Sequence, residues 1–284
     1  MKAVKRVLPS VNVQMGPHQI GQPLPSNKVD QYDPFLLLHH FGPKKLGPDK
    51  APFYVGAHPH RGFEPVTFIY QGAVEHKDSL GNHQVVEAGG VQWLTAGMGI
   101  VHAEGAPNSL VEEEGTIEII QLWINLPSAL KMNPANYQPF KKEEIPSVKL
   151  PNDQGELQVI SGKYKEIKGP VKSLTGITAY NLYLKGAGEF KIDFPLNEQV
   201  LIYQLNGQSK LNDIAVYAKE LIAFKLEGTT VHFKAEENST YLILSGVPIE
   251  EEVVSWGPYV MNSQTEVLEA LRDYQMGKMG MLTH

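Results

Sequence analysis

The segment Thr67-Phe68-Ile69-Tyr70-Gln71 returns in the second half of the chain as Leu201-Ile202-Tyr203-Gln204. Both segments are rich in β-branched and aromatic residues, which suit the pleated surface of a strand. Similar runs recur between turn signals such as Gly81-Asn82 and Asn206-Gly207. The runs that we interpret as strands are Val66–Tyr70, His83–Glu87, Thr116–Leu126, Leu157–Ile160, Asn181–Leu184, Val200–Leu205, Leu221–Leu226 and Tyr241–Leu244. This spacing is typical of an all-β sandwich or barrel, and the repeat predicts two similar barrels in tandem.

Chain length and local composition suggest where the two barrels meet. A chain of 284 residues reaches the upper limit of a single hydrophobic core, about 250–300 residues, so we expect two domains. Between Gln138 and Asp153, charged residues and prolines replace large apolar residues. We therefore expect a first barrel at residues 1–137, a linker at 138–153 and a second barrel at 154–284.

Helical periodicity stands out once, near the C-terminus. Ser263 and Glu266 have the spacing of a capping box. Apolar residues follow at helical spacing: Val267, Leu268, Leu271 and Tyr274. We expect a short helix in the second domain that ends near Gly277.

Composition excludes several classes of protein. Cysteine is absent, which rules out disulfide scaffolds, zinc fingers, iron–sulfur clusters and cysteine nucleophiles. The net charge of −6 comes without a basic cluster, so direct nucleic-acid binding is not expected. The longest aliphatic run, Phe35–Leu38, is far too short to span a bilayer, and polar residues interrupt the N-terminal segment where a signal peptide needs an apolar core. We expect a cytoplasmic monomer with no membrane contact.

Two stretches of the first half contain candidate functional residues. They are His58-Pro59-His60-Arg61-Gly62-Phe63-Glu64 and Gly97-Met98-Gly99-Ile100-Val101-His102-Ala103-Glu104. Residues i and i+2 of a strand point to the same face, so His58 pairs with His60 and His102 pairs with Glu104. Facing strands would bring three imidazoles and one carboxylate to a common point. Such a donor set with open coordination positions suits Fe(II), with Mn, Ni, Co, Cu or Zn as alternatives.

A single histidine on a strand is more often an ordinary core or surface residue. We apply that interpretation to His18, His83, His232 and His284. Four converging polar groups need either a dense hydrogen-bond network or a cation, because each unpaired buried group costs about 1–3 kcal/mol. We favour the cation for the set that contains His58.

The same residues resemble the two motifs of the cupins, in which His-x-His and a Glu precede a glycine-rich turn and a further His. Longer strings are closer to the pirins, the family with two cupin domains. They are Asp33-Pro34-Phe35-Leu36-Leu37-Leu38, Phe41-Gly42-Pro43, His58 to Glu64, Gln92-Trp93-Leu94-Thr95-Ala96-Gly97, His102-Ala103-Glu104, Gln121-Leu122-Trp123-Ile124-Asn125-Leu126-Pro127 and Gly257-Pro258-Tyr259-Val260-Met261-Asn262. The resemblance implies two tandem cupin (jelly-roll) β-barrels.

The resemblance also implies a ligand set. The iron ligands of pirins match His58, His60, His102 and Glu104, whereas ordinary cupins use the Glu of the first motif, here Glu64. Both carboxylates are present, and spacing favours Glu104 because it shares a strand face with His102. Glu64 would then support the ligands from outside the metal's coordination sphere or serve the fold.

The second half looks different at the matching positions. Aligning the shared Ile-Tyr-Gln strings places Lys191 and Asp193 where His58 and His60 stand in the first half. These two side chains cannot reproduce a histidine pair. We expect the first barrel to bind metal and the second to be metal-free.

Two functions follow from the resemblance, and the sequence leaves both open. Some pirins have quercetin 2,3-dioxygenase activity, which implies an oxidoreductase that takes dioxygen and a small planar polyphenol, with Glu104 as the base for the flavonol 3-hydroxyl. Others are transcriptional or signalling co-regulators, which implies a non-catalytic module whose iron redox state is read by a protein partner.

Several side chains of the first half are candidates for a pocket wall: His40, His76, Phe53, Phe68 and Trp123. A planar ligand needs apolar and aromatic walls with a few polar groups. Ordinary core packing is the alternative for each aromatic residue. His39 and His40 follow an apolar run, and one of them could contact a metal ligand without binding the metal itself.

Overall fold

The computed structural model describes residues 1–282 and confirms an all-β chain, with antiparallel strands throughout its named sheets. Every run that the sequence marks as a strand overlaps an observed strand. The chain forms two compact units. The histidine unit comprises Val13–Ile20, Phe35–Lys142 and Ile249–His284, and the apolar unit comprises Met1–Asn12, Gly21–Pro34 and Glu143–Pro248.

The strands of the histidine unit form two sheets. The larger has the order β12 (Asn136–Phe140), β9 (Val91–Thr95), β6 (Phe63–Gln71), β11 (Thr116–Asn125), β4 (Phe35–Lys45), β3 (His18–Leu24) and β2 (Val11–Met15). The smaller has the order β5 (Tyr54–His60), β10 (Ile100–Gly105), β7 (Ala73–Asp78) and β8 (His83–Glu87). A hairpin of β25 (Val254–Trp256) and β26 (Tyr259–Met261) and the helices α1 (Asn108–Glu112) and α2 (Gln264–Gln275) complete it.

Strand alternation decides which side chains of the smaller sheet face the interior. Along β7, Val74, His76 and Asp78 are buried, whereas Glu75 is partly exposed and Lys77 is exposed. All of β10 is buried. Polar side chains on the inner face of these two strands therefore meet inside the unit, because successive residues of a strand point to opposite faces.

The apolar unit repeats the two-sheet plan. Its larger sheet has the order β1 (Val4–Pro9), β22 (Glu220–Phe224), β19 (Gln199–Asn206), β24 (Ser239–Gly246), β17 (Thr178–Leu184), β14 (Gly155–Ser161) and β13 (Ser147–Lys149). The smaller has the order β18 (Glu189–Asp193), β23 (Thr230–Ala235), β20 (Gln208–Leu211) and β21 (Ile214–Tyr217). The short strands β15 (Lys163–Tyr164) and β16 (Ile167–Lys168) pair with each other.

Large apolar side chains fill the interior of the apolar unit. Phe190 and Ile192 of β18 join its core, whereas Lys191 and Asp193 alternate with them and are exposed. The two residues that match His58 and His60 in the sequence therefore lie on the outer face of their strand. A polar donor set has no counterpart in this part of β18.

Both chain ends depart from the expected domain boundaries. We expected residues 1–137, 138–153 and 154–284 to form a barrel, a linker and a barrel. Instead, β1 pairs with β22, which adds the N-terminus to the sheet of the apolar unit. The C-terminal residues from Ile249 onward belong to the histidine unit. The expected linker contains the change between units after Lys142, but its β13 segment pairs with β14 and is part of a sheet.

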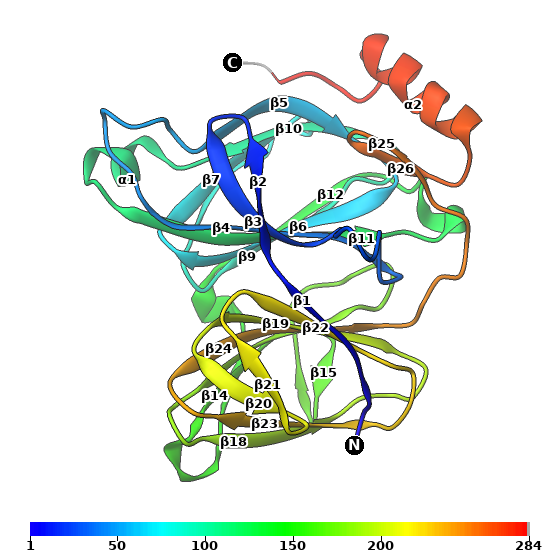
Figure 1. Cartoon of the computed structure of the whole chain (residues 1–284). Helices are drawn as coiled ribbons and strands as arrows, with labels where there is room; N and C mark the ends of the chain where they lie inside the picture. Colours follow the sequence, from blue (N-terminus) through cyan, green and yellow to red (C-terminus); the bar gives the residue numbers. More distant parts are fainter. Residues whose placement is uncertain (283–284) are drawn as a thin grey trace. The chain divides into compact units, whose positions relative to one another are not determined.

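Helix α2 begins as the sequence indicates. The hydroxyl of Ser263 accepts a hydrogen bond from the Glu266 amide, and the Glu266 carboxylate accepts one from the amide of Asn262. Val267 and Ala270 are buried, and α2 packs against β25 and β26 (Figure 1). Leu268, which shares the helical spacing of these apolar residues, is 57% exposed. Within residues 1–282, no helix combines the length and apolarity that a membrane span requires.

Candidate metal centre

The three histidines of the two motifs come together on neighbouring strands. His58 of β5 lies directly opposite His102 of β10, and His60 lies opposite Ile100. A register shift between His102 and Glu104 interrupts the ladder there. Such bulges re-aim side chains and are frequent beside active sites. One ring nitrogen from each of His58, His60 and His102 lies within 4.8 Å of the other two.

The spacing of these nitrogens fits a metal ion. The Nε2 atoms of His58 and His60 are 3.1 Å apart. Two adjacent ligands that are each about 2.1 Å from a metal are about 3 Å apart when they subtend a right angle. The Nδ1–H of His58 donates to the Gly56 carbonyl at 2.7 Å, which leaves a lone pair on Nε2 of the neutral ring. Nε2 of His102 is buried and finds no hydrogen-bond partner within the described residues.

Two of the imidazoles are held in the neutral form that binds metals. Burial lowers the pKa of His60 well below its usual value, and a positive charge on His58 would lower it further. Burial also lowers the pKa of His102, with further lowering by His60, His58 and His76. Neutral imidazoles at neutral pH present lone pairs, so the residues present fit a divalent transition metal.

The two candidate carboxylates lie in different surroundings. Glu104 is buried and lines the same cavity as His58 and His60. Its carboxylate accepts hydrogen bonds from Gln121 Nε2 at 2.6 Å and from Thr67 Oγ1 at 3.4 Å, and it is not one of the three donors that converge within 4.8 Å. Glu64 is fully buried, accepts a hydrogen bond from Thr95 at 2.7 Å and is not part of that cavity's lining.

A cavity of about 240 Å³ leads to the histidines. Its walls are mainly apolar, and polar groups gather at one place. The lining residues are Met15, Ile20, Leu37, His39, Phe41, Phe53, Val55, His58, His60, Glu104, Ile119, Gln121, Trp123 and Pro258. This combination of apolar walls and a few convergent polar groups is typical of a small-molecule site.

The expected wall residues are confirmed in part. Phe53 and Trp123 line the cavity, and so does His39. His40 instead points to Glu118, 3.2 Å away, and Phe68 is buried in the core. Neither residue lines the cavity. His40 is turned away because strand alternation puts neighbouring side chains such as His39 and His40 on opposite faces, and Phe68 follows the alternative of ordinary core packing.

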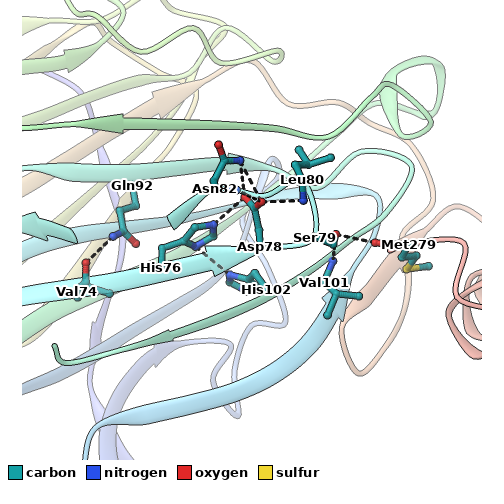
Figure 2. Close-up of polar contacts among 10 residues, drawn as sticks. All are labelled: Val74, His76, Asp78, Ser79, Leu80, Asn82, Gln92, Val101, His102 and Met279. Atoms are coloured by element: carbon teal, nitrogen blue, oxygen red, sulfur yellow. Dashed lines mark hydrogen bonds and ion pairs between the residues drawn. The ribbon is translucent and has the colours of Figure 1, made fainter. Parts of the chain in front are cut away.

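His76 lies behind the cluster. It lines a second, much smaller cavity with His102, Glu104, Gln121 and Tyr137. Figure 2 shows His76 between Asp78 and His102. Burial would raise the pKa of Asp78, but hydrogen bonds from His76 and Asn82 outweigh it and lower that pKa. Burial raises the pKa of Tyr137, and the nearby Glu104 and Asp78 raise it further.

The remaining histidines fit the ordinary interpretation. His18 is buried beside Phe41 and bonds to the Pro52 carbonyl. His83 pairs with Glu75, and His232 pairs with Glu189 in the apolar unit. His284 lies outside the described residues.

Sequence reasoning did not assign roles to Gln121 and Asp78. Both could have been found by the alternation that found the histidines. Asp78 stands two residues after His76, and Gln121 stands two residues before Trp123. What the sequence does not show is which strand lies opposite.

A chain of two antiparallel two-sheet units, one of which clusters three histidines beside a cavity that two of them and a carboxylate line, is a protein of the bicupin class. Family models agree with this assignment: Pirin matches residues 17–124, and the Pirin C-terminal cupin domain matches residues 179–280. The chain belongs to the pirin family.

Known relatives cover nearly the whole chain. A Pseudomonas aeruginosa protein named "putative quercetin 2,3-dioxygenase" is 36% identical over 92% of this chain and 94% of its own length. Pirin-1 of Arabidopsis thaliana is 36% identical over 89% of this chain and 86% of its own. The crystal structure of a quercetin 2,3-dioxygenase from Acinetobacter baumannii superposes with a TM-score of 0.93 at 34% identity, covering both chains completely.

Proposed function

We propose that this protein is a metal-dependent dioxygenase that cleaves flavonols such as quercetin. The observation that carries the proposal is the apolar cavity whose polar end is formed by His58, His60 and Glu104. The relatives named for quercetin 2,3-dioxygenase activity support the choice of substrate. The net reaction takes up both atoms of dioxygen, releases one ring carbon as carbon monoxide and leaves a depside.

His58, His60 and His102 would hold the metal, with Glu104 as the fourth ligand. Fe(II) suits this donor set, and Mn, Ni, Co, Cu or Zn have the same ligand preferences in part. A metal at this position supplies a Lewis acid that holds substrate and lowers the pKa of its hydroxyl group.

The chain's own residues contribute a base and a dry pocket. Glu104 accepts the proton of the flavonol 3-hydroxyl at a carboxylate oxygen. Gln121 holds that carboxylate in place through its 2.6 Å hydrogen bond. Phe53 and Trp123 flank the planar rings of the substrate and exclude water from the reacting carbon atoms.

The test is aerobic turnover of quercetin by iron-loaded protein, compared with the same concentration of iron in buffer. We expect turnover above the buffer rate and a loss of about 10²-fold or more in Glu104→Gln, the range for a general base. The matched control is Glu118→Gln, which alters a mostly buried carboxylate of the same unit away from the cavity. A rate equal to iron in buffer would refute catalysis and favour the regulatory module.

A further inference from the structure

A buried histidine–aspartate pair stands directly behind one of the three clustered histidines. Strand β7 is the neighbour of β10, and Asp78 lies opposite His102 while His76 lies opposite Glu104. The side chains of His76 and Asp78 are 2% and 0% exposed. Lys77, between them in the sequence, is exposed. The alternation of β7 therefore brings both groups inside, against the face that carries His102 and Glu104.

Hydrogen bonds join the side chains of Asp78, His76 and His102 into one network (Figure 2). His76 Nε2 lies 3.0 Å from Asp78 Oδ2, and His76 Nδ1 lies 3.4 Å from His102 Nδ1. A carboxylate only accepts, so His76 must donate from Nε2. The Nδ1 of a neutral His76 is then an acceptor, and His102 must donate from its own Nδ1. The lone pair of His102 is thereby left on Nε2.

N–H groups of the following turn donate hydrogen bonds to the Asp78 carboxylate, which keeps it in place as a hydrogen-bond acceptor. Its Oδ1 accepts from the amides of Leu80 and Asn82 at 2.9 and 3.1 Å, and the Asn82 side chain donates to both oxygens. The same turn is tied to its surroundings through Ser79, whose hydroxyl donates to the Met279 carbonyl and accepts from the Val101 amide. The carboxylate therefore has a fixed position and a full set of donors.

The ring of His76 is also held in its plane. Tyr137 of β12 stacks on it, with ring centroids 4.0 Å apart and an angle of 8° between the planes. With Asp78 at one edge and His102 at the other, the ring cannot turn without losing both hydrogen bonds. His76 and Asp78 thus have the geometry of a rigid support.

We propose that Asp78 and His76 are positioning residues that fix His102 in its Nδ1–H form and direct its Nε2 lone pair toward the nitrogens of His58 and His60. Within residues 1–282 the buried Nε2 of His102 has no hydrogen-bond partner, and it is the last atom of this hydrogen-bond network. Outer partners of this kind orient histidine ligands, and their removal typically weakens metal binding by about 10- to 100-fold. The proposal rests on the metal centre of the proposed function.

The first measurement needs no metal. Long-range ¹H–¹⁵N spectra of the apo protein distinguish the two neutral forms of His102. We expect the Nδ1–H form in the wild type. In Asp78→Asn, the turn amides keep the carbonyl oxygen at the Oδ1 position, so the new NH₂ group faces His76 and reverses both hydrogen bonds. We expect the Nε2–H form of His102 in that variant.

The second measurement is the dissociation constant for Fe(II) alone, determined anaerobically by competition with a chelator. We expect Asp78→Asn to weaken binding by about 10- to 100-fold. The matched control is Glu118→Gln, which alters the His40–Glu118 pair of the same unit, 3.2 Å apart, without touching His102. That control should bind Fe(II) as the wild type does.

The outcomes separate this proposal from the proposed function. Nε2–H in the wild type would overturn the positioning role, even if Asp78→Asn failed to fold. Unchanged Fe(II) affinity in a folded Asp78→Asn would overturn it as well, whether or not quercetin is cleaved. Conversely, the Nδ1–H form with weakened Fe(II) binding in Asp78→Asn supports it, even when the iron-loaded wild type does not turn over quercetin.

Discussion

Gln121 Nε2 donates a 2.6 Å hydrogen bond to Glu104 Oε1, and both side chains line the cavity that reaches the histidines. The amide therefore determines where the carboxylate stands when substrate enters. A hydrogen bond to a charged group contributes about 1.5–3 kcal/mol. In the proposed function Glu104 acts as the base, and this contact from β11 orients it.

Replacing Gln121 by Met keeps the approximate volume and removes the donor. We expect kcat for quercetin to fall by about ten- to a hundredfold with a smaller change in KM, because the carboxylate loses its orientation and the cavity walls remain. Steady-state kinetics check this. Gln71→Met is the matched control, since Gln71 makes a similar 2.8 Å bond to Glu118 away from the cavity. Equal losses in both variants would contradict a specific role for Gln121.

Removing one imidazole should abolish stoichiometric metal. We expect His58→Ala to purify without a full equivalent of metal, because two imidazoles remain of the three that converge. Saturating metal at 100 times Kd should stabilise the wild type by about 2.7 kcal/mol and leave His58→Ala unchanged. Elemental analysis and thermal unfolding measure both effects. His232→Ala, which alters a histidine of the apolar unit paired with Glu189, should keep the wild-type metal content.

The apo protein should lose stability in mild acid. Burial lowers the pKa of His39 to about 4, and those of His60 and His102 also lie well below 6.5. In the unfolded chain these histidines have pKa values near 6.5, so they take up protons there before they do so in the folded protein. The folded state is therefore most stable above pH 6.5, and its free energy of unfolding decreases as the pH falls toward 4. For His39 alone the loss approaches about 3 kcal/mol. Urea unfolding at several pH values measures it.

The variant His39→Gln serves as the internal comparison for that pH series. It removes the imidazole and should lose less stability than the wild type between pH 6.5 and 4.5. Identical slopes for the two proteins would show that His39 titrates alike in the folded and unfolded chain.

Lys131 should stabilise the position of strand β26 in the histidine unit. Its buried ammonium donates to the carbonyls of Gly62 and Val260 and to the Asn125 side chain, at 2.7 to 2.9 Å. Lys131→Met leaves these acceptors unpaired, at about 1–3 kcal/mol each, so we expect a loss of about 3 kcal/mol or more. Chemical denaturation measures it. Lys77→Met, at an exposed position, should change stability by no more than about 0.5 kcal/mol.

Local patterns in the sequence were enough to find eight of the strands and the histidines. Alternation along a strand places His58 with His60, and the structure brings both to His102. The capping box at Ser263 likewise predicted the start of α2, because the cap depends on residues three positions apart. These features are set by contacts within a few residues, so they can be recognised in the chain itself.

The sequence did not decide which carboxylate faces the cavity. Glu64 and Glu104 both follow a histidine motif, and only the packing of their strands shows that Glu104 lines the cavity and that Glu64 meets Thr95. Likewise, Leu268 fits the apolar spacing of α2 but lies outside the face that packs on the unit. The spacing of residues along a helix or strand shows which of them could share a face. Which face is buried depends on the element that packs against it.

The amino-acid sequence by itself determined that this protein is a pair of all-β cupin domains of the pirin type, with His58, His60, His102 and Glu104 as its candidate metal ligands. Only the tertiary structure decided that β1 joins the apolar unit, that α2 joins the histidine unit, and that Asp78 and His76 stand behind His102. The physical reason is register. Which residues face each other across a sheet depends on hydrogen bonds and packing between segments far apart in the chain, and no local pattern encodes them.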